Sequence, residues 1–90
     1  MSNKLCSNFT EAVNAFQEEP THSNFETIVR SAFAINSEIL EYLKQDLKMP
    51  IREKKGKLKF GSQTQPFDTV AENDMSRAVK NICGIVSRSP

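Results

Sequence analysis

Six of the twelve cationic side chains of this chain gather in one short segment. Because lysine outnumbers arginine there and aromatic residues are scarce, such a cluster attracts phosphates or carboxylates without reading base sequence. The other interpretation is that solvated lysines protect the edge of a strand from aggregation. The six cations fall within twelve residues and are Lys48, Arg52, Lys54, Lys55, Lys57 and Lys59.

Charge is also sorted along the whole chain. Residues 1–43 carry six carboxylates against two cations, whereas residues 44–60 carry seven cations against two carboxylates. The net charge is only +1, which is low for a dedicated nucleic-acid-binding domain. An acidic half and a basic segment in one chain can instead pair two copies, or can dock the chain onto an oppositely charged protein.

The residue types that most often carry out catalysis are sparse. His22 is the only histidine, and its place at an expected helix start is typical of an ordinary turn residue. The three glycines do not have the spacing of a phosphate-binding loop. Carboxylate neighbours such as Glu38 and Glu41, or Glu72 and Asp74, are more typical of a solvated surface than of a metal site. We therefore predict no enzyme activity, no cofactor and no metal site.

The two cysteines, Cys6 and Cys83, are far apart and lack the spacing of metal ligands. A disulfide between the ends of the chain is one interpretation, and two reduced thiols packed as small apolar residues is the other. No apolar run has the roughly 20 residues needed to span a bilayer, and the polar start is not typical of a secretory signal. We expect a cytoplasmic protein without membrane contact.

A length of 90 residues with 38% apolar residues predicts a single domain over 1–90, and the helical spacing of its apolar residues predicts that this domain is mainly helical. Apolar spacing and capping residues predict helices at about 8–19, 23–48 and 69–87. Between the second and third helices, residues 51–61 alternate apolar and charged side chains around a Lys-Gly turn. This pattern favours a short basic hairpin, although a mobile lysine-rich loop is the other interpretation.

The long second helix has two apolar stripes side by side, which cover more than a third of its circumference. Such a helix is packed on two sides, either at the centre of a small bundle or against a second subunit. Asn36 lies in the second stripe, where it either fixes the register of a helix pair or sits at a wet edge. The residues expected to mediate self-association are Val29, Phe33, Asn36, Leu40, Leu43 and Leu47.

Together these patterns predict a small, non-catalytic interaction or regulatory protein that binds another macromolecule. A protein partner or a second copy, as a homodimer, is the first expectation. The alternative is a nucleic-acid-binding protein that uses the lysine-rich segment 48–59.

Overall fold

A computed structural model of the protein describes residues 3–48 and 50–88. In this structure, a short hairpin packs against a set of helices. The prediction of a mainly helical protein with a basic hairpin is confirmed, but the described residues form four α-helices rather than three. The elements, in chain order, are α1 (Asn3–Glu18), α2 (His22–Ile35), α3 (Ile39–Leu47), β1 (Ile51–Lys54), β2 (Lys57–Phe60), the 3₁₀ turn η1 (Phe67–Thr69) and α4 (Glu72–Ser87).

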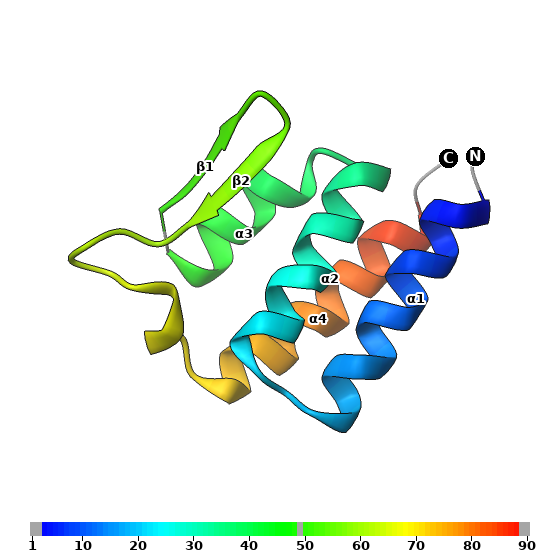
Figure 1. The fold of residues 1–90 in the computed structure, drawn as a ribbon, viewed down its shortest axis with the longest axis horizontal. Coiled ribbons are helices and arrows are strands. Elements are labelled where there is room, and N and C mark those ends of the chain that lie inside the picture. The colour runs from blue at the N-terminus through cyan, green and yellow to red at the C-terminus, as the bar shows by residue number, and fades with distance from the viewer. Residues whose placement is uncertain (1–2, 49, 89–90) are drawn as a thin grey trace.

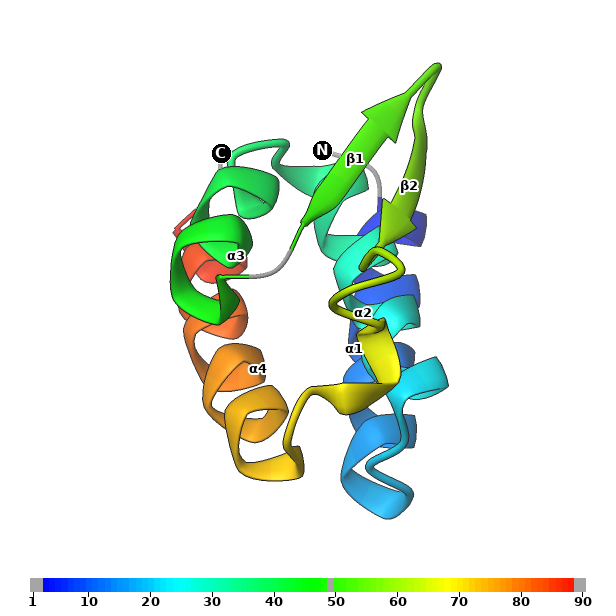
Figure 2. The ribbon, with the colours of Figure 1, turned by 90° about the vertical axis from the view of Figure 1, so that its left-hand side faces the viewer.

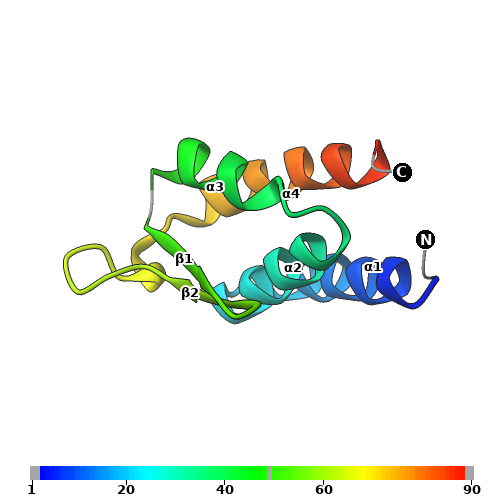
Figure 3. The ribbon, with the colours of Figure 1, turned by 90° about the horizontal axis from the view of Figure 1, so that it is seen from above.

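The helices form two layers. Helices α1 and α2 lie side by side in one layer, and α3 and α4 form the other (Figures 2 and 3). The hairpin lies on the opposite side of the molecule from the start of α1 and the end of α4 (Figures 1 and 3). The burial of Ile51 and Leu58 shows that one face of the hairpin lies toward the helices, while the other faces solvent.

The long helix predicted over 23–48 is wrong, because residues 36–38 divide it into α2 and α3. The side chain of Asn36 accepts a hydrogen bond from the backbone N–H of Glu38 at 3.0 Å. Asparagine favours such local turns over a continuous helix. The backbone of Asn36 is extended (φ −149°, ψ 109°), so the helix direction changes there.

Helix boundaries differ from prediction at other places too. Helix α1 begins at Asn3 rather than near residue 8, since Leu5 continues its apolar stripe and is half-buried. Helix α2 is capped by Thr21, whose side-chain oxygen accepts a hydrogen bond from the N–H of Asn24 at 3.1 Å. Helix α4 begins at Glu72 rather than at residue 69, because Thr69 is part of the 3₁₀ turn and donates its hydroxyl to Pro66 at 2.6 Å.

The apolar core lies between the two layers and extends under the hairpin. All the helices and both strands contribute to it, so the second helical stripe is covered largely by the chain itself. Its buried members are Phe9, Ala12, Phe16, Phe25, Ile28, Val29, Ala32, Ile39, Leu40, Leu43, Ile51, Leu58, Met75, Ala78, Val79 and Ile82.

Candidate functional site

The hairpin sorts its side chains onto two faces. Strands β1 and β2 are antiparallel, with Ile51 opposite Phe60 and Glu53 opposite Leu58. Ile51 and Leu58 are only 3% and 4% exposed, so this face lies on the helices. Because successive side chains of a strand point to opposite faces, the alternate residues lie on the outer face. The hairpin is thus an anchored element with a solvent-facing side.

The outer face of the hairpin carries four cations: Arg52, Lys54, Lys57 and Lys59. Arg52 lies directly opposite Lys59, and Lys54 lies directly opposite Lys57. All four side chains are exposed. Directly opposed side chains of an antiparallel pair lie about 5 Å apart at Cβ, and like charges at such positions destabilise the pairing. The structure therefore places two repulsive pairs next to each other on one face.

No carboxylate relieves this repulsion within the described residues. Cations elsewhere do find partners: Lys44 lies 3.2 Å from Glu41, and Arg77 lies 2.9 Å from Asp74 and 3.6 Å from Asp46. The hydrogen bond to Asp74, followed by the charge of Asp46, raises the pKa of Arg77. None of the ion pairs found in residues 3–48 and 50–88 includes a cation of the segment 48–59.

The turn of the hairpin contains a second unfavourable arrangement. Lys55 and Gly56 have φ angles of 53° and 79°, the positive values that a type I′ turn requires at both positions. Glycine adopts them freely, but for lysine the left-handed region costs about 1–2 kcal/mol. Glu53 steadies the turn, since its carboxylate accepts a hydrogen bond from the N–H of Gly56 at 2.8 Å. Lys48, at the end of α3, also has a positive φ of 53°.

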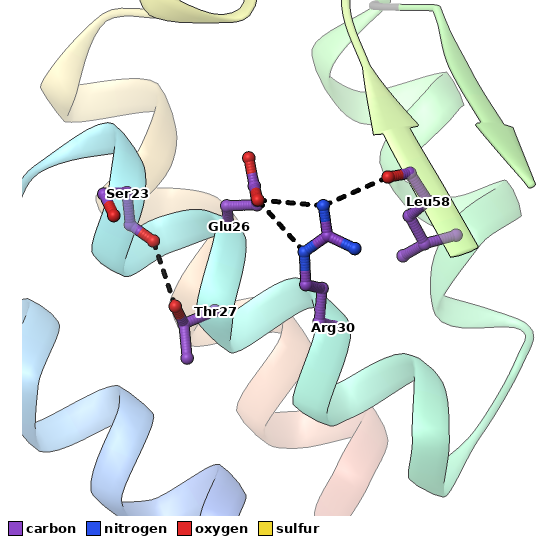
Figure 4. A network of polar contacts seen from close by, with 5 residues as sticks. All are labelled: Ser23, Glu26, Thr27, Arg30 and Leu58. Carbon is purple, nitrogen blue, oxygen red and sulfur yellow. Dashed lines mark hydrogen bonds and ion pairs between the residues drawn. The ribbon is translucent and has the colours of Figure 1, made fainter. Parts of the chain in front are cut away.

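Arg30 of α2 attaches the hairpin to the helices (Figure 4). Its guanidinium donates to Glu26 at 2.9 and 3.0 Å and to the carbonyl oxygen of Leu58 at 3.1 Å. It also lies over the ring of Phe60, 5.3 Å from the centroid. Arg30 is exposed, and its contacts with Leu58 and Phe60, which follow it by 28 and 30 positions, have no local signal in the sequence.

A chain of aromatic rings supports the same attachment. Phe67 of η1 lies 5.0 Å from Phe60, 6.0 Å from Phe25 and 5.7 Å from the ring of His22, between ring centroids. Phe25 in turn lies 6.1 Å from Phe16 of α1. Aromatic pairs at such separations stabilise beyond their buried area. The hairpin is therefore connected through these rings to both α1 and α2.

The six residues expected to mediate self-association fall into two groups. Val29 and Leu43 are 0% exposed and Leu40 is 8% exposed, so other elements of the same chain already cover them. Phe33, Asn36 and Leu47 are half-buried. The buried group therefore lies inside the helical bundle and needs no second subunit to cover it. Self-association stays a prediction, and only the half-buried group retains surface for it.

His22 has a local role at the start of α2. Its Nε2 donates to the carbonyl oxygen of Val70 at 2.8 Å, and its ring edge packs on Phe67. These contacts tie α2 to the segment that precedes α4. In the part of the chain that the structure describes, no three His, Cys, Asp or Glu side chains come together in a way that could hold a metal ion.

The two cysteines are not joined by a disulfide. Cys83 is partly buried on α4, and this burial raises the pKa of its thiol. Cys6 is exposed on α1, so the expectation that both thiols pack as small apolar residues holds only in part. No helix within the described ranges is both long enough and apolar enough to cross a membrane.

An open groove of about 670 Å³ lies between α1 and α4. Its apolar lining includes Phe16 and Val79, while its polar lining includes Glu72, Arg77 and Lys80. Because this lining bears both signs of charge, it does not select a ligand by charge. The outer face of the hairpin, where one sign dominates, is the more selective surface.

Comparison with known proteins adds no assignment: no model of a protein family, no curated protein and no solved structure matches the chain.

Proposed function

We propose that this chain is a non-catalytic binding protein, and that the outer face of its hairpin is the surface that contacts another, anionic macromolecule. One observation carries the proposal: Arg52 opposes Lys59 and Lys54 opposes Lys57, with all four exposed and without carboxylate partners among the described residues. Repulsion within such pairs weakens the hairpin when no partner is bound. An anionic partner would offset that repulsion by attracting all four cations.

The attachment of the hairpin supports a binding role as well. Buried Ile51 and Leu58, together with the Arg30 contacts, hold the ribbon against α2. A binding surface held in place before contact loses less conformational entropy when the partner arrives. A freely moving lysine-rich loop would not have this advantage.

Two variants with equal net charge test the proposal. The first replaces the four outer-face cations by glutamine (R52Q/K54Q/K57Q/K59Q). The second replaces four exposed cations on α1, on α3, on α4 and at the C-terminal cap of α4 (K4Q/K44Q/K80Q/R88Q). Each change lowers the net charge from +1 to −3, so general electrostatic attraction falls equally in both.

Binding is measured by fluorescence anisotropy with labelled poly-L-glutamate and with labelled duplex DNA, which present carboxylates and phosphates. We expect the wild type and the control variant to bind at least one of them, and the hairpin variant to bind neither at low salt. Equal binding by the two variants, or no binding by the wild type, would contradict the proposal. Circular dichroism of each variant checks that it is folded.

Self-association through α2 and α3 is a second, narrower candidate, supported by the half-buried apolar side chains Phe33 and Leu47. Light scattering decides it, since one chain has a mass of 10.2 kDa. A doubled mass that Phe33→Ser and Leu47→Ser together reduce to that of one chain would support the candidate. A single-chain mass for the wild type would remove it.

A further inference from the structure

We infer that the anionic partner of the hairpin is a nucleic-acid duplex, held through its phosphates and without preference for base sequence. The inference rests on the proposed function and adds the class of partner. Three features of the described residues carry it: the side-chain composition of the outer face, the backbone conformation at two lysines, and the shape of the ribbon.

The composition of the outer face suits phosphates better than a protein surface. Three of its four residues are lysines, which are depleted in protein–protein interfaces, and the two apolar residues Ile51 and Leu58 are buried on the other face. A protein partner would therefore meet neither an apolar centre nor an exposed aromatic anchor. Phosphate contacts need only cations, and lysine provides them as point charges.

Lysines also occupy two positions whose backbone conformation favours glycine or asparagine. Among the described residues, Lys48 and Lys55 are the two non-glycine residues with positive φ, and both belong to the basic segment. Glycine or asparagine adopts this conformation more easily. Strained backbone positions are often found at functional sites. Lys48 ends helix α3, where a left-handed residue is common, whereas Lys55 occupies the hairpin turn next to the repulsive pair of Lys54 and Lys57. A lysine at that turn position indicates that positive charge rather than stability determines the sequence of the hairpin.

The geometry of the ribbon matches a duplex. The Cβ atoms of opposed cationic residues lie about 5 Å apart, and successive outer-face residues of one strand are spaced about 7 Å apart along it. Duplex DNA presents one charge per about 1.7 Å of its axis, and its major groove of about 12 Å admits a two-stranded ribbon. A compact block of four cations thus meets several phosphates at once.

A duplex is favoured over a single strand because the outer face has no aromatic side chain. Proteins that hold single strands stack bases on exposed aromatic rings. In the hairpin, Phe60 lies on the inner face, between Arg30 and Phe67. The hairpin therefore has cations for a backbone but no platform for bases.

The salt dependence of duplex binding tests the inference. Anisotropy of a labelled duplex of about two helical turns is measured between about 50 and 200 mM KCl. Each neutralised phosphate contributes about −0.9 to the slope of log K against log salt, so four to six cations predict a slope between about −3.6 and −5.4. Lys54→Gln with Lys57→Gln should reduce the slope by about two units. The control, Lys4→Gln with Lys80→Gln, should leave it unchanged, and a duplex of scrambled sequence should bind equally.

The outcomes distinguish a failure of the duplex inference from a failure of the proposed function. Hairpin-dependent binding of poly-L-glutamate without binding of the duplex would overturn the duplex inference and leave the proposed function standing. Tighter binding of a single strand than of the duplex, or an equal change of slope in both double variants, would also overturn the inference. Absence of binding to either polymer would overturn the inference and the proposed function together.

Discussion

The segment α2–α3 and the hairpin are neighbours in the chain but differ in what they expose to solvent. In α2 and α3, the residues that looked available for a partner are mostly enclosed: Val29 and Leu43 are fully buried. In the hairpin, the inner face buries Ile51 and Leu58, but the outer face presents opposed cations, and a lysine occupies the turn with positive φ. One region is organised for stability, while the other combines a stable inner face with an unfavourable outer face.

This difference gives a way to separate structural from functional residues. Substitutions in a region organised for stability should reduce the free energy of unfolding. Substitutions that relieve an unfavourable arrangement should increase it, at the expense of binding, as occurs where function needs a strained site. The sign of the stability change therefore tests the comparison more sharply than its size.

The largest expected effect is in the helical core. Leu43→Ala removes a side chain that is 0% exposed and should lower the free energy of unfolding by about 2–5 kcal/mol, measured by urea denaturation. The adjacent Lys44→Ala is the control, since its exposed pair with Glu41 is worth about 0.5 kcal/mol or less. Similar losses for both variants would show that α3 is not packed as described.

The next effect is at the junction between the two regions. Arg30→Ala removes the hydrogen bond to the carbonyl of Leu58 and the contact with Phe60, and should lower the free energy of unfolding by about 1 kcal/mol. Hydrogen exchange should accelerate most at the amides of β1 and β2. Arg30→Lys keeps the charge but not the forked guanidinium group. Compared with Arg30→Ala, it should therefore restore only part of the protection of these amides from hydrogen exchange. Unchanged exchange in the hairpin would contradict its attachment through Arg30.

Lys55→Asn should have the opposite sign. Asparagine accepts the positive φ of 53° more readily than lysine, so the free energy of unfolding should rise by up to about 1 kcal/mol. Lys55→Ala is the matched control, because it removes the same charge but keeps the unfavourable conformation. Equal stability changes in the two variants would show that repulsion, rather than backbone conformation, is relieved.

The smallest stability effect is expected on the outer face. Lys57→Glu converts the repulsive pair with Lys54 into an attractive one and should raise the free energy of unfolding by about 0.2–1 kcal/mol. Lys57→Gln removes the repulsion without adding attraction, so its gain should be smaller. Both gains should shrink as salt increases, because the pair is exposed. A loss of stability in Lys57→Glu would contradict the opposed arrangement of the pair.

Local sequence patterns were sufficient for some parts of the fold and not for others. Alternation of apolar and charged residues around Lys55-Gly56 predicted the hairpin correctly, since pairing there is determined by adjacent residues. Apolar spacing also identified the buried helix faces. It missed the break at 36–38, because a stripe at helical spacing continues across Asn36 although its side chain favours a turn.

Contacts between distant segments had no comparable signal. Packing of residues 23–48 on two sides was predicted, but the sequence did not show that α1, α4 and the hairpin of the same chain cover them. Phe67 was not recognised as a centre of the aromatic cluster because its partners come from two other elements, α2 and β2. The cations of the hairpin were identified from sequence, but their opposed arrangement required the strand register.

The most direct test of the account is a map of the amides that respond to an anionic partner. In ¹⁵N–¹H spectra titrated with an unlabelled duplex at low salt, we predict that the shifts concentrate in residues 51–60 and at Lys48. Shifts centred on the groove between α1 and α4, or on Phe33 and Leu47, would contradict the claim that the outer face of the hairpin is the binding surface.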